Sequence, residues 1–134
     1  MDPKEFLKTI YLGDRACKKI IIDGWRHRLG LQVNSISRLE AGTENWSYYT
    51  DEDVDDGWLV FSKISSVSMN PDGLFPNDFI NSIDVSPQED KYLFLISVGS
   101  CSAKGDISEV VISVTADEVH IESNEDFLMV LREA

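Results

Sequence analysis

The sequence has few of the residues that build metal sites or nucleophilic sites. It contains two cysteines, Cys17 and Cys101, and two histidines, and these four residues form no ligand motif. A closed zinc site needs about four suitable ligands, and a domain of this length does not depend on disulfide staples. The sequence therefore predicts two reduced thiols, no metal site and no cofactor.

Long hydrophobic runs are absent as well. The longest apolar runs, such as YLFLISV at residues 92–98, are far shorter than the roughly 20 residues that cross a bilayer as a helix. The opening MDPKEFLKTI contains acids and lacks the apolar block of a signal peptide. We therefore expect a cytoplasmic protein without a membrane-spanning segment. Its 134 residues fit a single domain, residues 1–134.

Acidic residues outnumber basic residues by 24 to 12, which gives a net charge of -12. Residues 1–40 hold eight basic and five acidic residues, a net +3, so residues 41–134 carry -15. Such a field disfavours nucleic acid and anionic membranes as partners, and it favours a basic protein. Solubility alone is the simplest explanation of the acidity.

The order of the apolar residues predicts a mainly β or α+β fold. Residues 1–14 predict an N-terminal helix, because Asp2 can cap the first N–H groups, Pro3 suits the first helical position and Gly13 favours a helix end. After Cys17, short β-rich runs alternate with polar or glycine-containing breaks, which favours antiparallel strands. We expect an antiparallel sheet that forms a sandwich or an open barrel.

Local patterns also predict how some of these runs connect. The GWRHR segment at residues 24–28 is expected to be an exposed hairpin loop, and residues 57–69 one strand with a bulge midway. Residues 114–121 predict a tight hairpin around Ala116 and Asp117. The tail from Ser123 predicts a short C-terminal helix, with a final strand as the alternative.

The stretch YYTDEDVDDGW at residues 48–58 places five carboxylates between aromatic residues. A helix–loop–helix calcium loop requires glycine at its sixth position and glutamate at its twelfth. Counting from Asp51 puts Asp56 and Ser62 at these two positions, and counting from Glu52 supplies Gly57 but then Lys63. Neither register fits calcium. Catalysis by paired carboxylates is also disfavoured, because no nucleophile or base accompanies them.

Two interpretations of this stretch remain. In the first, it binds a protein partner, because aromatic residues beside charge are favoured at interfaces. In the second, Tyr49 and Trp58 pack inward and the acids only face water. The candidate partner-binding residues comprise five acids that supply charge and three aromatics that supply contact area: Asp51, Glu52, Asp53, Asp55, Asp56, Trp46, Tyr48 and Trp58.

Other polar residues carry weaker signals. His27 is expected at an exposed hairpin tip, and His120 on the solvent face of a strand. The segment SVGSCSAKGD at residues 97–106 contains glycine, serine and Cys101 but matches neither a G-x-S-x-G nucleophile motif nor a phosphate-binding loop. A β-hairpin loop explains it more simply.

Four segments, YLGDRACKKIIIDGW, NSISRL, WSYYTDEDVDDGWLVF and FPNDFINSIDV, together resemble a small bacterial family of unknown function. The resemblance spans most of the chain and brings no active-site signature, so it transfers no catalytic residue. It implies a compact bacterial cytoplasmic protein, similar in size, acidity and lack of motifs to the immunity proteins that neutralise basic toxin domains.

We therefore expect a non-enzymatic, acidic protein-binding domain with a basic protein partner, in the manner of an immunity protein that neutralises a basic toxin domain. The alternative is a small-molecule-binding domain or an enzyme, with a non-linear site between the sheet and the first helix. The third possibility is a structural module of a larger assembly. A deep pocket with converging polar groups favours the alternative, whereas a solid core and an acidic face favour binding.

Overall fold

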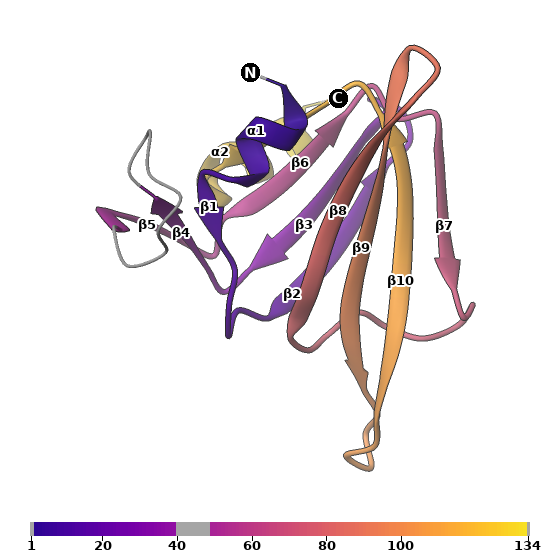
Figure 1. Ribbon diagram of the computed structural model, residues 1–134. Coiled ribbons are helices and arrows are strands. Elements are labelled where there is room, and N and C mark those ends of the chain that lie inside the picture. Colours follow the sequence, from indigo (N-terminus) through magenta and orange to yellow (C-terminus); the bar gives the residue numbers. More distant parts are fainter. Residues whose placement is uncertain (1, 40–48, 134) are drawn as a thin grey trace.

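The computed structural model describes residues 2–39 and 49–133, which fold mainly into antiparallel β-strands (Figure 1). None of the helices in this part of the chain is long and apolar enough to span a bilayer. The elements, in chain order, are α1 (Pro3–Leu7), β1 (Ile10–Tyr11), β2 (Cys17–Asp23), β3 (Arg28–Val33), β4 (Ser35–Leu39), β5 (Tyr49–Asp55), β6 (Trp58–Ser62), β7 (Ser66–Asn70), β8 (Ile80–Gln88), β9 (Lys91–Cys101), β10 (Ile107–Ala116), β11 (Glu118–Glu122) and α2 (Asn124–Arg132).

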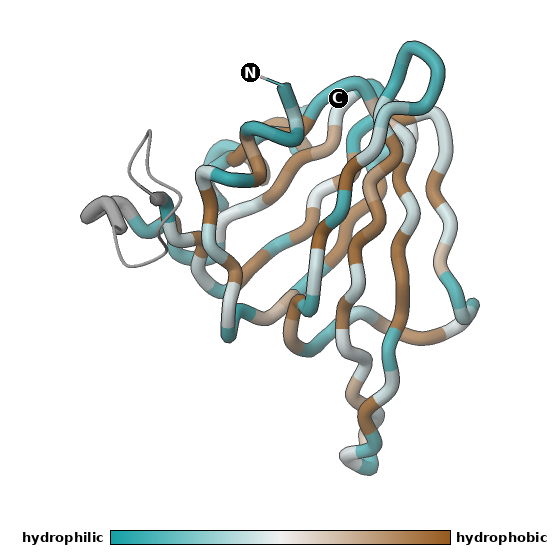
Figure 2. The backbone as a smooth tube through the Cα atoms, in the orientation of Figure 1, coloured by the Kyte–Doolittle hydropathy of each residue, from teal (hydrophilic) through white to brown (hydrophobic). Residues whose placement is uncertain are grey.

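Two four-stranded sheets enclose the main core. One has the strand order β11-β6-β3-β2 and the other β7-β10-β9-β8, and all their pairings are antiparallel. Alternate residues of the strands point inward, which gives the recurring hydrophobic positions along β9 and β10 in Figure 2. Phe61 of β6 meets Phe94 of β9 edge to face, with ring centroids 4.9 Å apart. The predicted antiparallel sandwich is confirmed, and the described strands close no barrel.

Helix α2 builds a second, smaller core on the outer face of the β11-β6-β3-β2 sheet. The ring of Phe127 stacks on that of Trp58, with centroids 4.0 Å apart and planes 12° from parallel. Trp58 Nε1 also donates a hydrogen bond to Asn124 Oδ1 over 2.9 Å. The helix begins after Ser123, whose Oγ accepts from the backbone N–H of Asp126. The helical prediction for the tail is therefore confirmed.

The N-terminal helix is much shorter than the sequence predicts. Asp2 and Pro3 start it as expected, with the Lys4 N–H donating to Asp2 Oδ1 over 3.5 Å, but α1 ends at Leu7. The prediction of a helix through Gly13 is wrong, because Ile10 pairs with Arg38 of β4 instead. This pairing adds a third sheet, β1-β4-β5, that the sequence did not suggest. Strand pairing and burial of Ile10 outweigh local helical periodicity here.

Two of the four predicted connections are wrong, whereas the hairpin loop expected within residues 97–106 is confirmed between β9 and β10. The single bulged strand is instead β6 and β7, which lie in different sheets and are separated by Lys63 at a positive φ of 54°. The tight hairpin around Asp117 is instead a crossing between sheets, since β10 pairs with β9 and β7 whereas β11 pairs with β6. Lys91 links the two crossings, because its Nζ donates to Asp117 Oδ1 over 2.6 Å and to the Lys63 carbonyl over 3.3 Å. The β2–β3 hairpin is confirmed, although Arg28 belongs to β3 rather than to the loop.

Candidate functional site

The acidic stretch folds into strand β5 and the turn that follows it. Strand β5 pairs with β4, so that Ser35 lies opposite Asp55 and Ser37 opposite Asp53. The side chains of Asp53 and Asp55 are exposed, whereas Val54 between them packs against the main core. The two carboxylates therefore share the outer face of the three-stranded sheet. Neither forms an ion pair with another residue that the structure describes.

Other residues of the candidate set have different environments. Asp56 lies in the turn at a φ of 53° and accepts a hydrogen bond from Lys18 Nζ over 2.7 Å, so part of its charge is neutralised locally. The backbone of Asp51 and Glu52 belongs to β5, and their side chains lie outside the described part of the structure. Trp46 and Tyr48 also lie outside the described residues.

Trp58 does not belong to a partner-binding surface. It is only 1% exposed, and the interaction with Phe127 covers its ring. The predicted contact role for Trp58 is therefore wrong, and the inward-packing interpretation describes it correctly. The reason is that β6 is a central strand with α2 on its outer face, so that neither of its faces reaches solvent at this position.

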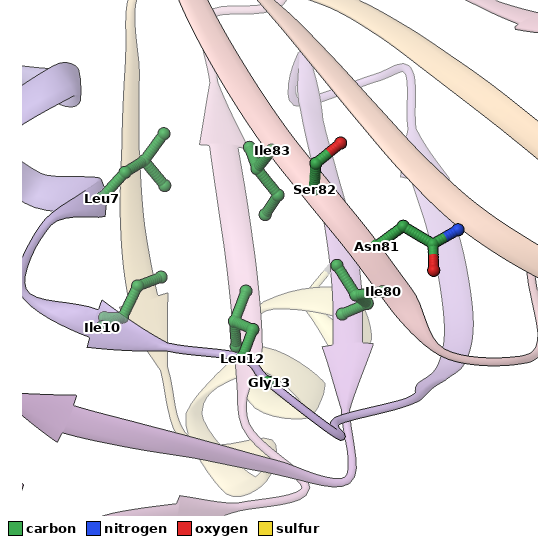
Figure 3. Close-up of a pocket in the computed structure, with 8 residues that line it drawn as sticks. All are labelled: Leu7, Ile10, Leu12, Gly13, Ile80, Asn81, Ser82 and Ile83. Carbon is green, nitrogen blue, oxygen red and sulfur yellow. The ribbon is translucent and has the colours of Figure 1, made fainter. Parts of the chain in front are cut away.

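A shallow apolar groove separates the α1–β1 segment from strand β8 (Figure 3). Its volume is about 210 Å³. Leu7, Ile10 and Leu12 form one wall, and Ile80 and Ile83 form the other. Asn81 and Ser82 of β8 also line the groove, but their side-chain polar atoms point away from the space between these walls in Figure 3. The groove can therefore accept an apolar side chain, but it offers no converging polar groups to a small polar ligand.

The groove and the acidic strand belong to connected parts of the surface. Strand β1, which supplies Ile10 to the groove, pairs with β4, and β4 pairs with β5. Tyr11, Ser37 and Asp53 consequently form one row across this sheet. Strands in a sheet are roughly 5 Å apart, so the row spans about 10 Å. Tyr11 adjoins the groove residue Ile10 in β1, and the row spans about one Debye length at moderate salt, so carboxylates on β5 can attract a basic partner that covers both β1 and β5.

The described residues offer little support for nucleophilic or metal chemistry. Burial raises the pKa of the Cys17 thiol to about 12, against a smaller lowering by its hydrogen bond to the Lys19 carbonyl. This thiol is therefore protonated at neutral pH and is 1% exposed. Among residues 2–39 and 49–133, no group of three or more His, Cys, Asp or Glu side chains converges as a metal site.

Comparison with known proteins identifies the family but not an activity. The model of a family of unknown function, DUF6258, matches residues 1–129 of the chain. The chain belongs to the DUF6258 family. No curated protein and no solved structure matches it. The resemblance to a family of unknown function is confirmed, whereas bacterial origin, likeness to immunity proteins and a cytoplasmic location stay predictions.

In this DUF6258 member, sequence reasoning missed an ion network beside α2. Glu122 accepts from Arg28 Nη2 over 2.7 Å, and its other carboxylate oxygen lies 2.6 Å from His120 Nε2. Burial raises the pKa of Glu122, but the hydrogen bonds and positive charges of His120 and Arg28 outweigh burial and lower it overall. The spacing of His120 and Glu122, two residues apart in a predicted strand, was the available signal, because such residues share a face.

Proposed function

We propose that this chain is a non-enzymatic protein-binding domain whose partner carries a basic surface and an apolar anchor residue. What carries the proposal is the apolar groove between α1–β1 and β8, in the same part of the fold as the exposed carboxylates of Asp53 and Asp55. An apolar centre with charged residues around it is the common anatomy of protein interfaces. The specific role we propose is that of an immunity protein that neutralises a basic toxin domain.

In the proposed mechanism, charge and apolar contact act at different stages. The net charge of -12 attracts a basic partner from a distance and raises its association rate. Asp53 and Asp55 then act at short range, since no ion pair within the described residues neutralises them. An apolar side chain of the partner fills the groove and slows dissociation, because anchors in pockets account for most of the binding energy at interfaces.

The character of the groove supports binding over catalysis. Catalytic pockets combine an apolar lining with polar groups aimed at the substrate. Here Leu7, Ile10, Leu12, Ile80 and Ile83 make the walls, and the two polar residues that also line the groove, at positions 81 and 82, turn their polar atoms away from its centre in Figure 3. The sheets behind the groove enclose a continuous apolar core that includes Ile10 and Ile80.

The test of the electrostatic step is the association rate with a basic toxin domain, and a toxin gene beside the gene for this chain, if one is found, supplies the first candidate. The double variant Asp53→Asn and Asp55→Asn is expected to associate several-fold more slowly and with a weaker salt dependence, with a smaller increase in the dissociation rate. The matched control, Asp72→Asn with Glu109→Gln, removes the same charge from exposed positions on the loop after β7 and on β10. Equal slowing by both double variants would assign the effect to net charge and reject strand β5 as the contact.

The apolar step is tested by Leu7→Ala, which shortens one wall of the groove. We expect dissociation to become about tenfold faster, corresponding to roughly 1.4 kcal/mol of lost anchoring, with little change in association. Co-expression with the toxin domain then tests the biological role. The wild-type chain should restore growth, and a chain that binds the domain without restoring growth would retain the binding proposal but reject immunity.

A further inference from the structure

A second and larger cleft lies where the β9–β10 hairpin extends beyond the sandwich, at the end away from α1 (Figure 1). Its volume of about 580 Å³ falls in the range of small-molecule sites. One wall is the loop of residues 71–79, which contributes Leu74 and Phe75. The other wall is the hairpin, which contributes Ser100, Asp106 and Ser108.

At the cleft, the inward-facing positions of β9 and β10 change from apolar residues to serine. Along the inner face of β9 the buried residues Phe94, Ile96 and Val98 are followed by Ser100. Ser100 lies opposite Ser108 of β10, two residues before the inward-facing Val110. Ser100 as a residue is only 7% exposed, and its hydroxyl makes no hydrogen bond to another described residue, but its Oγ is not among the described buried polar atoms that lack a partner, so it reaches solvent in the cleft. A hydroxyl that faces the cleft can accept a hydrogen bond from a donor group of a ligand.

Hydrogen bonds hold both walls of the cleft in place. The side chain of Asn77 pairs with the backbone of Cys101 in both directions, accepting from its N–H over 2.7 Å and donating to its carbonyl over 3.0 Å. At the hairpin tip, the Asp106 N–H donates to Ser102 Oγ over 3.1 Å, and the Ser102 N–H donates to the Asp106 carbonyl over 2.8 Å. A site fixed before binding loses less conformational entropy when a ligand enters.

The lining determines the charge and shape of the ligand. Asp106 is the one charged residue among the described residues that line the cleft, so anions are repelled and cations attracted. Phe75 is 77% exposed, which leaves its ring available to a flat cation. A carboxylate and serine hydroxyls supply the acceptors that a planar, five-donor guanidinium requires.

We propose that this cleft binds an alkyl guanidinium group, held by Asp106 and the serine hydroxyls and stacked on Phe75. The group can belong to a free small molecule or to an arginine side chain of a protein. The proposal does not depend on the partner-binding function proposed above, because strand β5 and the α1–β8 groove contribute no residue to this cleft.

The experiment is an amide chemical-shift titration of the full chain with agmatine, with an arginine-containing tripeptide and with the matching citrulline tripeptide. Saturable shifts centred on Ser100, Cys101 and Asp106 are expected with one or both guanidinium probes but not with citrulline. Binding of agmatine identifies a free small molecule as sufficient, whereas binding of the arginine peptide alone identifies a protein ligand. No binding by either probe, or equal binding of citrulline, overturns the proposal.

Substitutions test whether Asp106 and Phe75 bind the guanidinium group. Asp106→Asn and Phe75→Leu should each weaken guanidinium binding by about tenfold or more. Asp72→Asn removes the same charge from an exposed residue that does not line the cleft, so we expect less than about a twofold effect. The Asp53→Asn and Asp55→Asn variant should bind agmatine like the wild type, which separates failure here from failure of the proposed function. Unchanged affinity in Asp106→Asn, or equal loss in Asp72→Asn, rejects this site.

Discussion

The packing of α2 on the sheet leads to the sharpest prediction about the free energy of unfolding. Phe127 is 2% exposed and stacks on Trp58 with ring centroids 4.0 Å apart. Replacing it with alanine removes roughly 150 Å² of buried apolar area, which costs about 4 kcal/mol at about 25 cal/mol per Å², and the lost stacking adds about 1 kcal/mol. Because a helix on the surface can settle partly into the space, we expect Phe127→Ala to lower the free energy of unfolding by about 3–5 kcal/mol.

Urea denaturation followed by tryptophan fluorescence measures this loss, because Trp58 becomes exposed when the helix detaches. Met129 on the same helix is 56% exposed, so Met129→Ala is the matched control and should change stability by less than about 0.5 kcal/mol. A loss below about 1 kcal/mol in Phe127→Ala, or an equal loss in the control, would refute the docking of α2 through this ring.

A second substitution tests the same contact from the opposite side. A Cβ added at Gly30 would lie 2.4 Å from a Phe127 ring atom and 2.8 Å from a Trp58 ring atom. Gly30→Ala alone should therefore cost about 1–3 kcal/mol through overpacking. In the Phe127→Ala background the same change should cost clearly less, because the nearer of the two obstructing rings is gone and the Trp58 ring has room to shift. Strictly additive effects would show that Gly30 and Phe127 do not touch.

Two further predictions concern charge and thiols. Because the pKa of Glu122 is lower in the folded chain than in the unfolded chain, its stabilising effect is present at neutral pH and is lost as the pH falls from about 5 through the folded pKa. Glu122→Gln should therefore lower the free energy of unfolding at pH 7, measured by urea denaturation, and reduce the loss of stability between neutral and acid pH. The control Glu118→Gln changes a side chain that is 58% exposed and should have little effect. If Glu122→Gln lost stability with falling pH as steeply as the wild type, the network would be contradicted. In thiol titration with Ellman's reagent, the native chain should react at Cys101 and not at buried Cys17. Unfolding should then release the second thiol, and rapid reaction of both thiols in the native chain would contradict the burial of Cys17.

The sequence predicts most individual strands correctly because alternation of apolar and polar residues is a local property. The segments around residues 79–85, 91–101, 107–115 and 118–123 all form strands close to the expected positions. Alternation does not record which sheet a strand joins. The crossings at Lys63 and Asp117 place β6 and β11 in one sheet and β7 and β10 in the other, and these assignments depend on contacts between distant residues.

The candidate site likewise combines features that the sequence predicts with features that depend on tertiary structure. Composition alone predicts the acidity, and the run of acids predicts that Asp53 and Asp55 face water, but not that they belong to a strand paired with β4. Nothing local distinguishes Trp58 from an exposed anchor, because its burial depends on Phe127, which lies 69 positions later in the chain. The alternative hypothesis placed a site between the sheet and the first helix, where the α1–β8 groove lies, but the lining residues of this groove and the cleft beside Phe75 could not be read from the sequence, since each is lined by segments that are distant in the chain.

The sequence by itself thus determined the β-rich class, the two helix starts at Asp2 and Ser123, and the negative charge, because each follows from neighbouring residues or from composition. Tertiary structure decided where α1 ends, how the strands divide among three sheets and which apolar residues are buried. These outcomes depend on pairing and packing energies between residues far apart in the chain, and those energies outweigh the small differences in local propensity.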